Sequence, residues 1–337
     1  MSATTSLRTA NLCFLGYGNV NRTLVRLLAD RAEELRERYR IAWRVTGIAS
    51  RRLGWIADPD GIDITADVVS EAGSKTSTVR DWLRAAKADV LFEATSLNVT
   101  DGQPAIDHLR AALELGAHAI TANKGPIVFA YDELRQLALQ QNKRFFFEST
   151  VLDGVPIFSL FRESLPTIHL KSIRGILNST TNVILTGVEQ GLTFEESLKK
   201  AQDIGIAETD ASADIEGWDA TVKITALVNV LMGVRLHPAD VQRQGIQDLS
   251  AEVVRAARAA GLPYKLVCRA HRTSTGAEAS VRPEQVPLTD PLALVSGSSS
   301  IIQFETDIFP RLTITEENPG LYATAYGMLA DFVRAVS

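Results

Sequence analysis

Short apolar runs alternate with amphipathic patterns through the first 150 residues. The apolar runs, each typical of a buried strand, are residues 11–15, 43–49, 88–95, 118–122 and 144–150. The amphipathic segments, each typical of a helix, are residues 20–39, 104–115 and 132–141. Strands that alternate with helices require crossover connections, so this half is predicted to be an α/β domain with a doubly wound parallel sheet.

The pattern changes after residue 150. Helical spacing recurs at residues 156–165, 180–190, 194–204, 218–233, 251–260 and 321–336. Strand-like runs lie at residues 171–176, 280–286 and 299–305. The change predicts a domain boundary near residue 150, with an α+β domain after a first domain of residues 1–150.

Composition narrows the class of protein. A length of 337 residues suits about two domains, and 45% hydrophobic with 22% charged residues is typical of a globular chain. The two cysteines, Cys13 and Cys268, form no C-x-x-C motif, which argues against a disulfide scaffold or a zinc site and favours the cytoplasm. No apolar run reaches the roughly 18 residues of a membrane span. A net charge of −5 makes a nucleic-acid partner a poor expectation.

The first strand runs into a glycine turn, Gly16 to Asn21, that opens the first helix. Gly16 suits a tight turn, and Gly18 lets the backbone approach a pyrophosphate. Asn19 and Val20 then begin a helix whose N–H groups face that phosphate, which predicts a Rossmann-type dinucleotide site. Asn21 stands where a third glycine usually lies, so we expect a slightly shifted helix with the phosphate seat retained.

Two strand ends carry further candidate cofactor residues. The second strand is followed by Arg51 and Arg52, without the acid that a free ribose usually meets, which predicts that NADP is preferred over NAD. The alternative is a solvated basic loop. Thr95 and Ser96 end the strand at 88–95, where they could contact the nicotinamide ribose or merely cap the strand.

The densest group of ionisable residues lies between residues 208 and 223. Asp219 and Lys223 are four residues apart on a predicted helix and therefore share a face. Either they form an ordinary surface pair, or the apolar neighbours of Lys223 place it in a partly dry cleft, where its amine can exchange protons. The residues alone leave these two interpretations about even.

Several short motifs together resemble one family. They are GYGNV (16–20), TANKG (121–125), GILNSTTN (175–182), DIEGWD (214–219), FETD (304–307) and ATAYG (323–327). With Lys223, they make the chain similar to homoserine dehydrogenases over nearly its whole length. The DIEGWD motif followed by the lysine is specific, whereas the glycine turn is not.

The resemblance implies interconversion of L-homoserine and L-aspartate 4-semialdehyde with NADP or NAD. It assigns the acid/base role to Lys223 and places Lys124 near the nicotinamide as a second catalytic lysine, which can add positive charge at the same substrate oxygen. It also implies that Glu208, Asp214 and Asp219 bind the substrate ammonium and orient the lysine.

The resemblance also implies an organisation and a partner. A helix within 318–337 would return to the dinucleotide domain, and residues 151–317 would form the catalytic and dimerisation domain of a homodimer. We expect a short form without a C-terminal regulatory domain, acting in threonine and methionine biosynthesis. Thr180 is a candidate donor for the substrate carboxylate. Gly320, which precedes the last helix, matches a cofactor-binding position of the family.

Many family members bind a monovalent cation after the first domain. The corresponding positions here are Glu148, Val151, Asp153 and Val155, so Na⁺ or K⁺ is a candidate ligand. Asp153 is a departure from the small residues of the family, and it could equally fill the loop.

Three alternatives stand beside this assignment. A related enzyme could act on another amino-aldehyde or amino alcohol. A catalytically silent NADP-binding paralogue is a second alternative, which the joint presence of the two lysines and the acidic residues opposes. Aspartate-semialdehyde dehydrogenase needs a thiol nucleophile, and neither cysteine lies in a suitable position.

Overall fold

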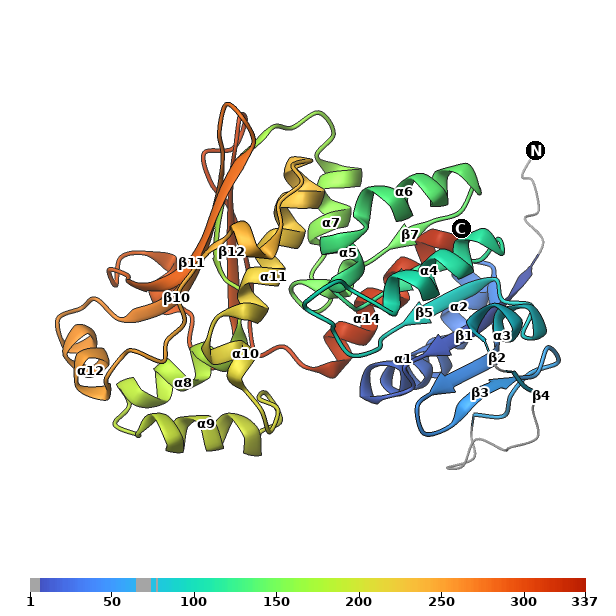
Figure 1. The fold of residues 1–337 in the computed structure, drawn as a ribbon, viewed down its shortest axis with the longest axis horizontal. Helices are drawn as coiled ribbons and strands as arrows, with labels where there is room; N and C mark the ends of the chain where they lie inside the picture. Colours follow the sequence, from blue (N-terminus) through green and yellow to red (C-terminus); the bar gives the residue numbers. More distant parts are fainter. Residues whose placement is uncertain (1–6, 65–73, 77) are drawn as a thin grey trace. The chain divides into compact units, whose positions relative to one another are not determined.

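A computed structural model describes residues 7–64, 74–76 and 78–337 (Figure 1). The chain separates into two compact units: Met1–Ile157 together with Gly320–Ser337, and Phe158–Pro319. The last helix of the chain therefore belongs to the first unit. Among the described residues, none of the helices has the length and hydrophobicity that crossing a bilayer requires.

The described part of the first unit is built on a seven-stranded sheet with the order β4-β3-β2-β1-β5-β6-β7. Its strands are β1 (Arg8–Leu15), β2 (Ile41–Ser50), β3 (Gly54–Ala57), β4 (Ser74–Lys75), β5 (Val90–Glu93), β6 (His118–Thr121) and β7 (Phe145–Phe146). The strands β2, β1, β5, β6 and β7 are parallel, whereas β3 and β4 are antiparallel. The strand order reverses beside β1, which confirms the doubly wound sheet.

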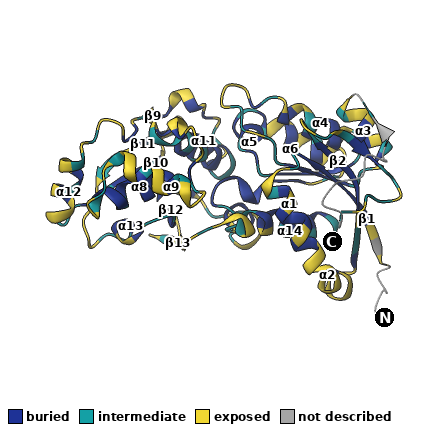
Figure 2. Ribbon diagram, turned by 90° about the horizontal axis from the view of Figure 1, so that it is seen from below, coloured by how far each residue is buried: buried dark blue, intermediate teal, exposed yellow. Residues whose placement is uncertain are grey.

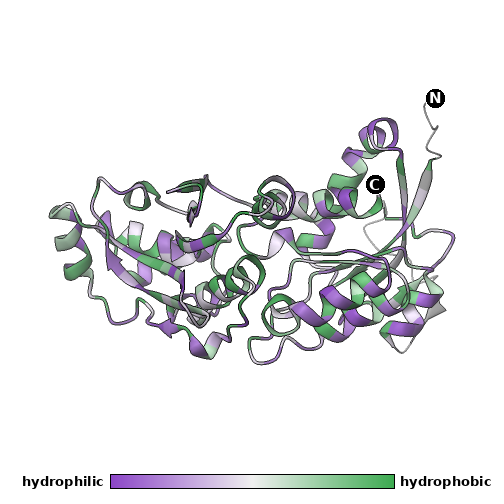
Figure 3. Cartoon of the chain, turned by 90° about the horizontal axis from the view of Figure 1, so that it is seen from above, coloured by the Kyte–Doolittle hydropathy of each residue, from purple (hydrophilic) through white to green (hydrophobic). Residues whose placement is uncertain are grey.

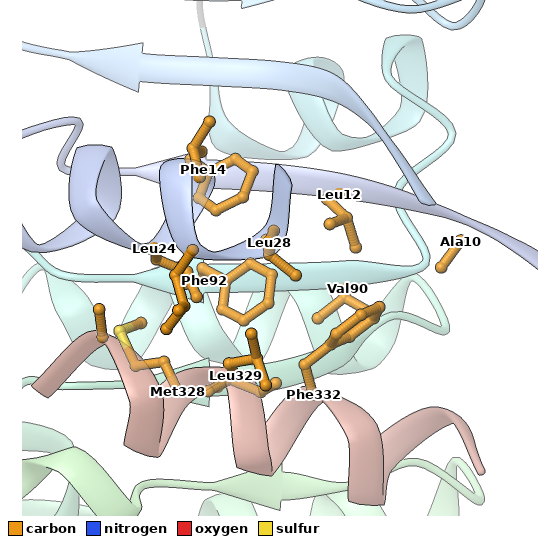
Figure 4. Close-up of a cluster of buried hydrophobic side chains, with 14 of the residues drawn as sticks. Ala10, Leu12, Phe14, Leu24, Leu28, Val90, Phe92, Met328, Leu329 and Phe332 are labelled. Carbon is orange, nitrogen blue, oxygen red and sulfur yellow. The ribbon is translucent and has the colours of Figure 1, made fainter. Parts of the chain in front are cut away.

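Helices cover both faces of this sheet. They are α1 (Asn19–Asp30), α2 (Ala32–Arg38), α3 (Val79–Ala85), α4 (Ala105–Glu114), α5 (Gly125–Phe129), α6 (Tyr131–Gln140) and α14 (Leu321–Val336). On one face, α1 and α14 pack together over β1 and β5, and Phe14, Leu24, Phe92, Met328 and Phe332 share one apolar cluster (Figure 4). On the other face, α4 packs against β5 and β6. This core fixes the carboxyl ends of the parallel strands, where ligands bind in such sheets.

The second unit contains a six-stranded sheet with the order β13-β12-β8-β10-β11-β9. Its strands are β8 (Leu170–Ile176), β9 (Gln242–Arg243), β10 (Tyr264–Arg272), β11 (Ala277–Gln285), β12 (Ser300–Thr306) and β13 (Leu312–Glu316). Neighbouring strands are antiparallel except for β9 with β11. Antiparallel pairing without crossover helices leaves one face of the sheet available for other contacts.

The helices of the second unit differ in how far they are buried. They are α7 (Ile157–Ser159), α8 (Ser179–Glu189), α9 (Phe194–Asp203), α10 (Ser212–Ile215), α11 (Trp218–Leu227), α12 (Ala251–Ala259) and α13 (Pro291–Leu294). Exposed residues dominate α9 and α12, whereas α8 and α11 are mostly buried and pack against β10 (Figure 2). Figure 3 shows the chain coloured by hydropathy, with hydrophobic and hydrophilic residues both present along the helices. The candidate chemistry of this unit therefore lies on its buried helices.

Three predicted elements have other bounds in the structure, and β10 was not predicted at all. The helix expected at 20–39 breaks at Arg31, because the segment between Leu28 and Leu35 has no large apolar side chain to pack. The strand expected at 144–150 covers only Phe145–Phe146, and a 3₁₀ turn follows at Glu148–Thr150. The helix expected at 218–233 ends at Leu227 and continues as a wider π-type turn.

Candidate active site

A buried ion pair lies on α11. The Lys223 Nζ atom is 3.0 Å from Asp219 Oδ2, and the two side chains are only 16% and 18% exposed. The same Nζ atom donates a hydrogen bond to the Leu177 carbonyl at 2.7 Å. The interpretation of Lys223 as an ordinary surface lysine is therefore wrong, because the ammonium is held in one place and largely shielded from water.

The sequence of α11 explains this burial. The helix begins after Gly217, whose φ of +83° is a left-handed conformation that glycine adopts without strain. Seven of its ten residues are buried, so the helix is surrounded by the rest of the unit on most sides. A lysine on such a helix is buried together with its neighbours, and Asp219 one turn earlier balances its charge.

Asn178 joins the acidic residues of the cluster, and the sequence interpretation missed it. Its Nδ2 atom donates to Asp214 Oδ1 at 2.6 Å and to Asp219 Oδ2 at 2.9 Å. Its Oδ1 atom accepts the Thr181 backbone N–H at 2.8 Å and so caps α8. One amide therefore both begins α8 and holds two carboxylates together. The GILNSTTN motif was the available signal, since an asparagine before a helix is a common cap.

Asp214 has a raised pKa. The largest cause is desolvation by burial, followed by repulsion from the Asp219 carboxylate, and the bond from Asn178 acts in the opposite direction. The Thr180 hydroxyl also stabilises the charged form, and this side chain is buried at the first turn of α8. Because its charged form is destabilised by burial, the Asp214 carboxylate is suited to form an ion pair with a cationic group of a ligand.

Glu208 is not part of this buried cluster. It is exposed in the loop after α9, where its backbone carbonyl accepts a hydrogen bond from Gln202 Nε2. The structure therefore brings together Asp214, Asp219 and Lys223 but leaves Glu208 in solvent. Its role in binding an ammonium group stays a prediction.

The glycine turn follows β1 in the first unit. Gly16 has φ +78°, and a Cβ atom there would lie 2.4 Å from the Ala94 carbonyl oxygen, so the turn requires glycine. At Gly18 the nearest neighbour of such a Cβ is 4.0 Å away, and no side chain caps α1. The free N–H groups of Asn19 and Val20 and the open space at Gly18 fit a phosphate group.

Asn21 holds the glycine turn from inside the protein. Its side chain is fully buried, and its Nδ2 atom donates to the Leu15 carbonyl at 3.0 Å and to the Gly16 carbonyl at 3.1 Å. The position therefore substitutes two hydrogen bonds for the close backbone packing that a third glycine would allow. The open space at Gly18 is compatible with Asn21, and the phosphate seat there stays a prediction.

The end of β2 lies beside this turn. The backbone N–H groups of Gly16 and Tyr17 both donate to the Ala49 carbonyl, at 2.9 and 3.2 Å. Arg51 and Arg52 follow in an exposed turn between β2 and β3. Both guanidinium groups are therefore available in solvent close to the end of the strand that contacts the glycine turn.

Thr95, Ser96 and Lys124 follow the carboxyl ends of β5 and β6. The Thr95 backbone N–H donates to Glu93 Oε1 at 2.8 Å, which is the strand-end cap foreseen as the alternative for Thr95. The Ser96 carbonyl accepts from Asn123 Nδ2 at 3.4 Å. Lys124 is half-buried at the start of α5. The parallel strands place these residues at one edge of the sheet.

The segment proposed for a cation packs against α14. Glu148 is buried, with Oε2 3.6 Å from Arg334 Nη1, and Asp153 Oδ1 accepts from the Thr324 hydroxyl at 2.8 Å. Among the described residues no three His, Cys, Asp or Glu side chains are grouped as metal ligands. The two acidic side chains thus already have protein partners, and the Val155 carbonyl accepts the Ile157 N–H at 2.8 Å. A cation bound by these groups and by Val151 stays a prediction.

Gly320 occupies the N-cap position of α14 with an extended backbone. A Cβ atom there would meet nothing within 4 Å. The backbone of this position therefore does not require glycine.

Two family models match the chain. The model described as homoserine dehydrogenase matches residues 156–333, and the model described as its NAD-binding domain matches residues 16–148. The chain belongs to the homoserine dehydrogenase family. Members of this family are NAD(P)-dependent oxidoreductases that act on a CH–OH group.

Homoserine dehydrogenases of similar length are among its relatives. The chain is 34% identical to an NAD(+)-dependent homoserine dehydrogenase from Pseudomonas canavaninivorans, covering 96% of this chain and 95% of that protein. It is 32% identical to a homoserine dehydrogenase from Methanocaldococcus jannaschii, covering 96% of this chain and 97% of that one.

Solved structures of homoserine dehydrogenases share the fold. A protein from Archaeoglobus fulgidus, described as a homoserine dehydrogenase by similarity, has a TM-score of 0.83 at 28% identity and covers 96% of this chain and 98% of its own. A hyperthermophilic archaeal homoserine dehydrogenase mutant in complex with NADPH has a TM-score of 0.80 at 27% identity, covering 97% and 98%.

The cysteines do not fit a thiol mechanism. Cys13 and Cys268 are both free and buried. Burial raises the pKa of each thiol to about 12, so the thiolate needed for nucleophilic attack is scarce near neutral pH. This finding supports a homoserine dehydrogenase over an aspartate-semialdehyde dehydrogenase.

Proposed function

We propose that this protein interconverts L-aspartate 4-semialdehyde and L-homoserine, with Lys223 as the acid/base. The observation that carries the proposal is the Lys223 ammonium, held at 3.0 Å from Asp219 and 2.7 Å from the Leu177 carbonyl in a largely buried cluster. A fixed ammonium that is shielded from water stabilises negative charge on a reacting oxygen more strongly than an ammonium in bulk water does.

Lys223 moves the proton of this reaction. When bound, the nicotinamide cofactor supplies or accepts the hydride. As an aldehyde is reduced, negative charge grows on its oxygen, and the Lys223 ammonium stabilises this charge and donates the proton that completes the hydroxyl group. In the reverse direction the neutral amine removes that proton while the hydride leaves the same carbon. Asp219 keeps the amine in position through both steps.

The neighbouring groups suit the remainder of an amino-acid substrate. Asp214, whose charged form is costly in its buried position, gains a partner when the substrate ammonium binds. Thr180 is assigned to the substrate carboxylate, for which its hydroxyl, bonded to Asp214 in the structure, turns to the substrate on binding, and the N-terminus of α8 lies beside it. Glu208 lies in a loop preceding α10 and is assigned to the same ammonium group.

The cofactor is proposed to lie along the carboxyl ends of β1, β2, β5 and β6. Gly16, Gly18, Asn19 and Val20 form the pyrophosphate seat. Thr95, Ser96, Lys124 and Gly320 are assigned to the cofactor as well, with Lys124 adding positive charge near the nicotinamide.

NADP is proposed to be preferred over NAD. The support is that Arg51 and Arg52 are exposed at the end of β2, without a nearby acid in the turn at 51–53 to repel a 2′-phosphate. Arg51→Ala should weaken NADPH binding about tenfold and leave NADH binding nearly unchanged, measured by fluorescence titration. Equal losses for both cofactors would remove the argument, and Arg36→Ala on the exposed face of α2 is the control.

The test of the activity is oxidation of NADPH with aspartate 4-semialdehyde. Lys223→Ala should lower kcat by about a thousandfold. Lys199→Ala is the matched control, since Lys199 also pairs with an aspartate four residues away, at 3.1 Å, but is 74% exposed. Turnover only with other amino-aldehydes would identify the related-enzyme alternative. NADPH binding without turnover of any amino alcohol would identify a silent paralogue.

A homodimer is proposed through the second sheet. Around α13, one face of this sheet is covered by apolar side chains, and the remainder of that face carries a cavity of about 290 Å³ with polar and charged residues. Arg311 contributes positive charge there and Glu305 contributes negative charge, whereas Arg269 is paired with Glu284 through two hydrogen bonds. Charges of both signs allow the patch to complement a second copy of itself across a two-fold axis. A monomer in light scattering would contradict this proposal.

A monovalent cation at the segment 148–155 and a cytoplasmic location stay predictions. Glu148 is the one buried carboxylate among the four positions assigned to the cation, and it faces Arg334. Activity that is unchanged in sodium, potassium and choline chloride would count against a functional cation.

A further inference from the structure

Glu93 is a fully buried carboxylate at the end of β5. It is the last residue of the strand, its exposure is 0%, and it lies outside every role assigned so far. Its pKa is raised, chiefly because burial removes the charged group from water. An apolar residue would fill this position without that cost, so the carboxylate calls for an explanation.

The two carboxylate oxygens of Glu93 accept hydrogen bonds from residues at the ends of two neighbouring strands. Oε1 accepts hydrogen bonds from the backbone N–H of Thr95, at 2.8 Å, and from the Thr95 hydroxyl. Oε2 accepts from the hydroxyl of Thr121, at 2.6 Å, at the end of the neighbouring strand β6. The carboxylate therefore connects the loop after β5 with the loop after β6.

Thr121 and Asn123 complete the connection. The Thr121 oxygen accepts the Asn123 backbone N–H at 2.9 Å, and Asn123 Oδ1 accepts the Gly125 N–H at 3.0 Å. The Asn123 Nδ2 atom returns to the first loop, where it donates to the Thr95 carbonyl at 3.2 Å. The result is a closed hydrogen-bonded circuit that runs from Glu93 through both loops and back.

The circuit includes one predicted cofactor contact, Thr95, and lies next to two others, Ser96 and Lys124. Thr95 and Ser96 lie in the first loop, and Lys124 lies between Asn123 and Gly125 in the second. Both loops leave the carboxyl ends of adjacent parallel strands, which is the edge where doubly wound sheets bind ligands. A buried charge accepting several hydrogen bonds is a rigid way to fix the distance between two loops.

We propose that Glu93 is a positioning residue that holds the Thr95–Ser96 loop and the Lys124 loop in register for the nicotinamide half of the cofactor. It acts by its hydrogen bonds to Thr95 and Thr121, and through Thr121 on Asn123, rather than by touching the cofactor. The inference rests on the proposed function for its catalytic consequence, but its structural consequence is independent of turnover.

The variants distinguish the effect of losing a hydrogen bond to Glu93 from the effect of changing the side-chain packing. Thr121→Val keeps the shape of the side chain and removes the hydroxyl that Glu93 receives, whereas Thr121→Ser keeps the hydroxyl. Glu93→Gln replaces one accepting oxygen with an N–H₂ group, so one of the two loops loses its acceptor. Thr46→Val on β2 is the control, because Thr46 is equally buried in the same sheet but lies away from both loops.

The first measurement is hydrogen–deuterium exchange of the free protein over residues 94–98 and 121–125. Glu93→Gln and Thr121→Val should raise exchange about tenfold in both segments together, while Thr121→Ser and Thr46→Val stay near the wild type. Unchanged exchange in both variants, or a rise confined to the segment that was mutated, would overturn the positioning role.

The second measurement is steady-state kinetics with NADPH. Glu93→Gln and Thr121→Val should raise the KM for NADPH and lower kcat by about tenfold each, and Thr121→Ser should restore both. Equal kinetics for Thr121→Val and Thr46→Val would overturn the catalytic consequence. If the wild-type protein shows no NADPH-dependent turnover, the proposed function fails, and the exchange experiment alone decides on Glu93.

Discussion

Lys223 and Asp219 lie one helical turn apart on α11, with Nζ 3.0 Å from Oδ2 and less than a fifth of either side chain exposed. Lys199 and Asp203 on α9 have the same spacing and a separation of 3.1 Å, but they are 74% and 61% exposed. Because water screens the second pair, only the first can impose a fixed orientation and a strong field on a bound substrate.

This contrast predicts the effect of removing each carboxylate. Asp219→Asn should lower kcat by about a hundredfold, because Lys223 loses the charge that balances and orients it. Asp203→Asn should leave kcat within about twofold of the wild type, since an exposed pair contributes little. Steady-state kinetics of the two variants checks this prediction, and equal losses would place the role of Asp219 in folding instead.

Asn178 should be needed for activity beyond its contribution to stability. Asn178→Ala removes the cap of α8, at a cost of about 1 kcal/mol in the free energy of unfolding, and also separates Asp214 from Asp219. Ser250→Ala removes the corresponding cap of α12 and is the control. We expect similar stability losses in urea unfolding, with a rise of about tenfold or more in the KM for the amino-acid substrate only for Asn178→Ala. Equal KM values would show that Asn178 is merely a cap.

Asn21 should stabilise the cofactor seat. Asn21→Ala removes the two hydrogen bonds to the carbonyls of Leu15 and Gly16, each worth about 1 kcal/mol, and should weaken NADPH binding roughly tenfold or more. Asn11→Ala is the matched control, because Asn11 is also a buried asparagine bonded to a backbone carbonyl, but it lies toward the other end of β1. Fluorescence titration with NADPH measures both. A comparable loss in the two variants would indicate a general effect on the sheet.

Lys265 should make stability depend on pH in the alkaline range. This lysine is buried, donates to Asn182 Oδ1 and the Val295 carbonyl, and has its pKa lowered by desolvation from 10.5 to about 8, with Arg258 acting in the same direction and Glu189 opposing. Between these values the unfolded chain binds more protons than the folded chain, so the free energy of unfolding rises with pH, at most by about 1.4 kcal/mol per pH unit.

Lys265→Met removes this titration. Urea unfolding at about pH 7.5 and about pH 9.5 should therefore show a larger rise in the free energy of unfolding for the wild type than for the variant. The difference between the two proteins is the relevant quantity, because other groups titrate equally in both. Parallel pH profiles would mean that Lys265 titrates in the folded protein as it does in water.

The five parallel strands of the first unit were readable from the sequence because each contains a short apolar run, whereas β3, β4, α3 and α5 were not predicted. Strand β10 of the second unit was not predicted either. Its sequence contains Lys265 and Arg269, and a charged residue in a strand is ordinarily taken as facing water. Lys265 is nevertheless buried, because acceptors from α8 and from the turn at 295–299 surround it.

The residues of the candidate site, like the elements of the fold, could be predicted from the sequence only in part. The sequence identified Asp214, Asp219 and Lys223 through a specific motif, and the glycine turn through its place between a strand and a helix. It did not identify Asn178 or Glu93, since an asparagine before a helix and an acid at a strand end are common and carry no chemical signal by themselves.

By itself, the sequence determined the fold class, the family and the residue types that can carry the chemistry, because these depend on local periodicity and on short motifs. Only the tertiary structure decided which of those residues are withdrawn from water and which groups they face. The pKa of an ammonium or a carboxylate group, and the electrostatic field that it produces, depend on its solvation and on neighbouring groups that are distant in the chain. Only folding brings these groups together.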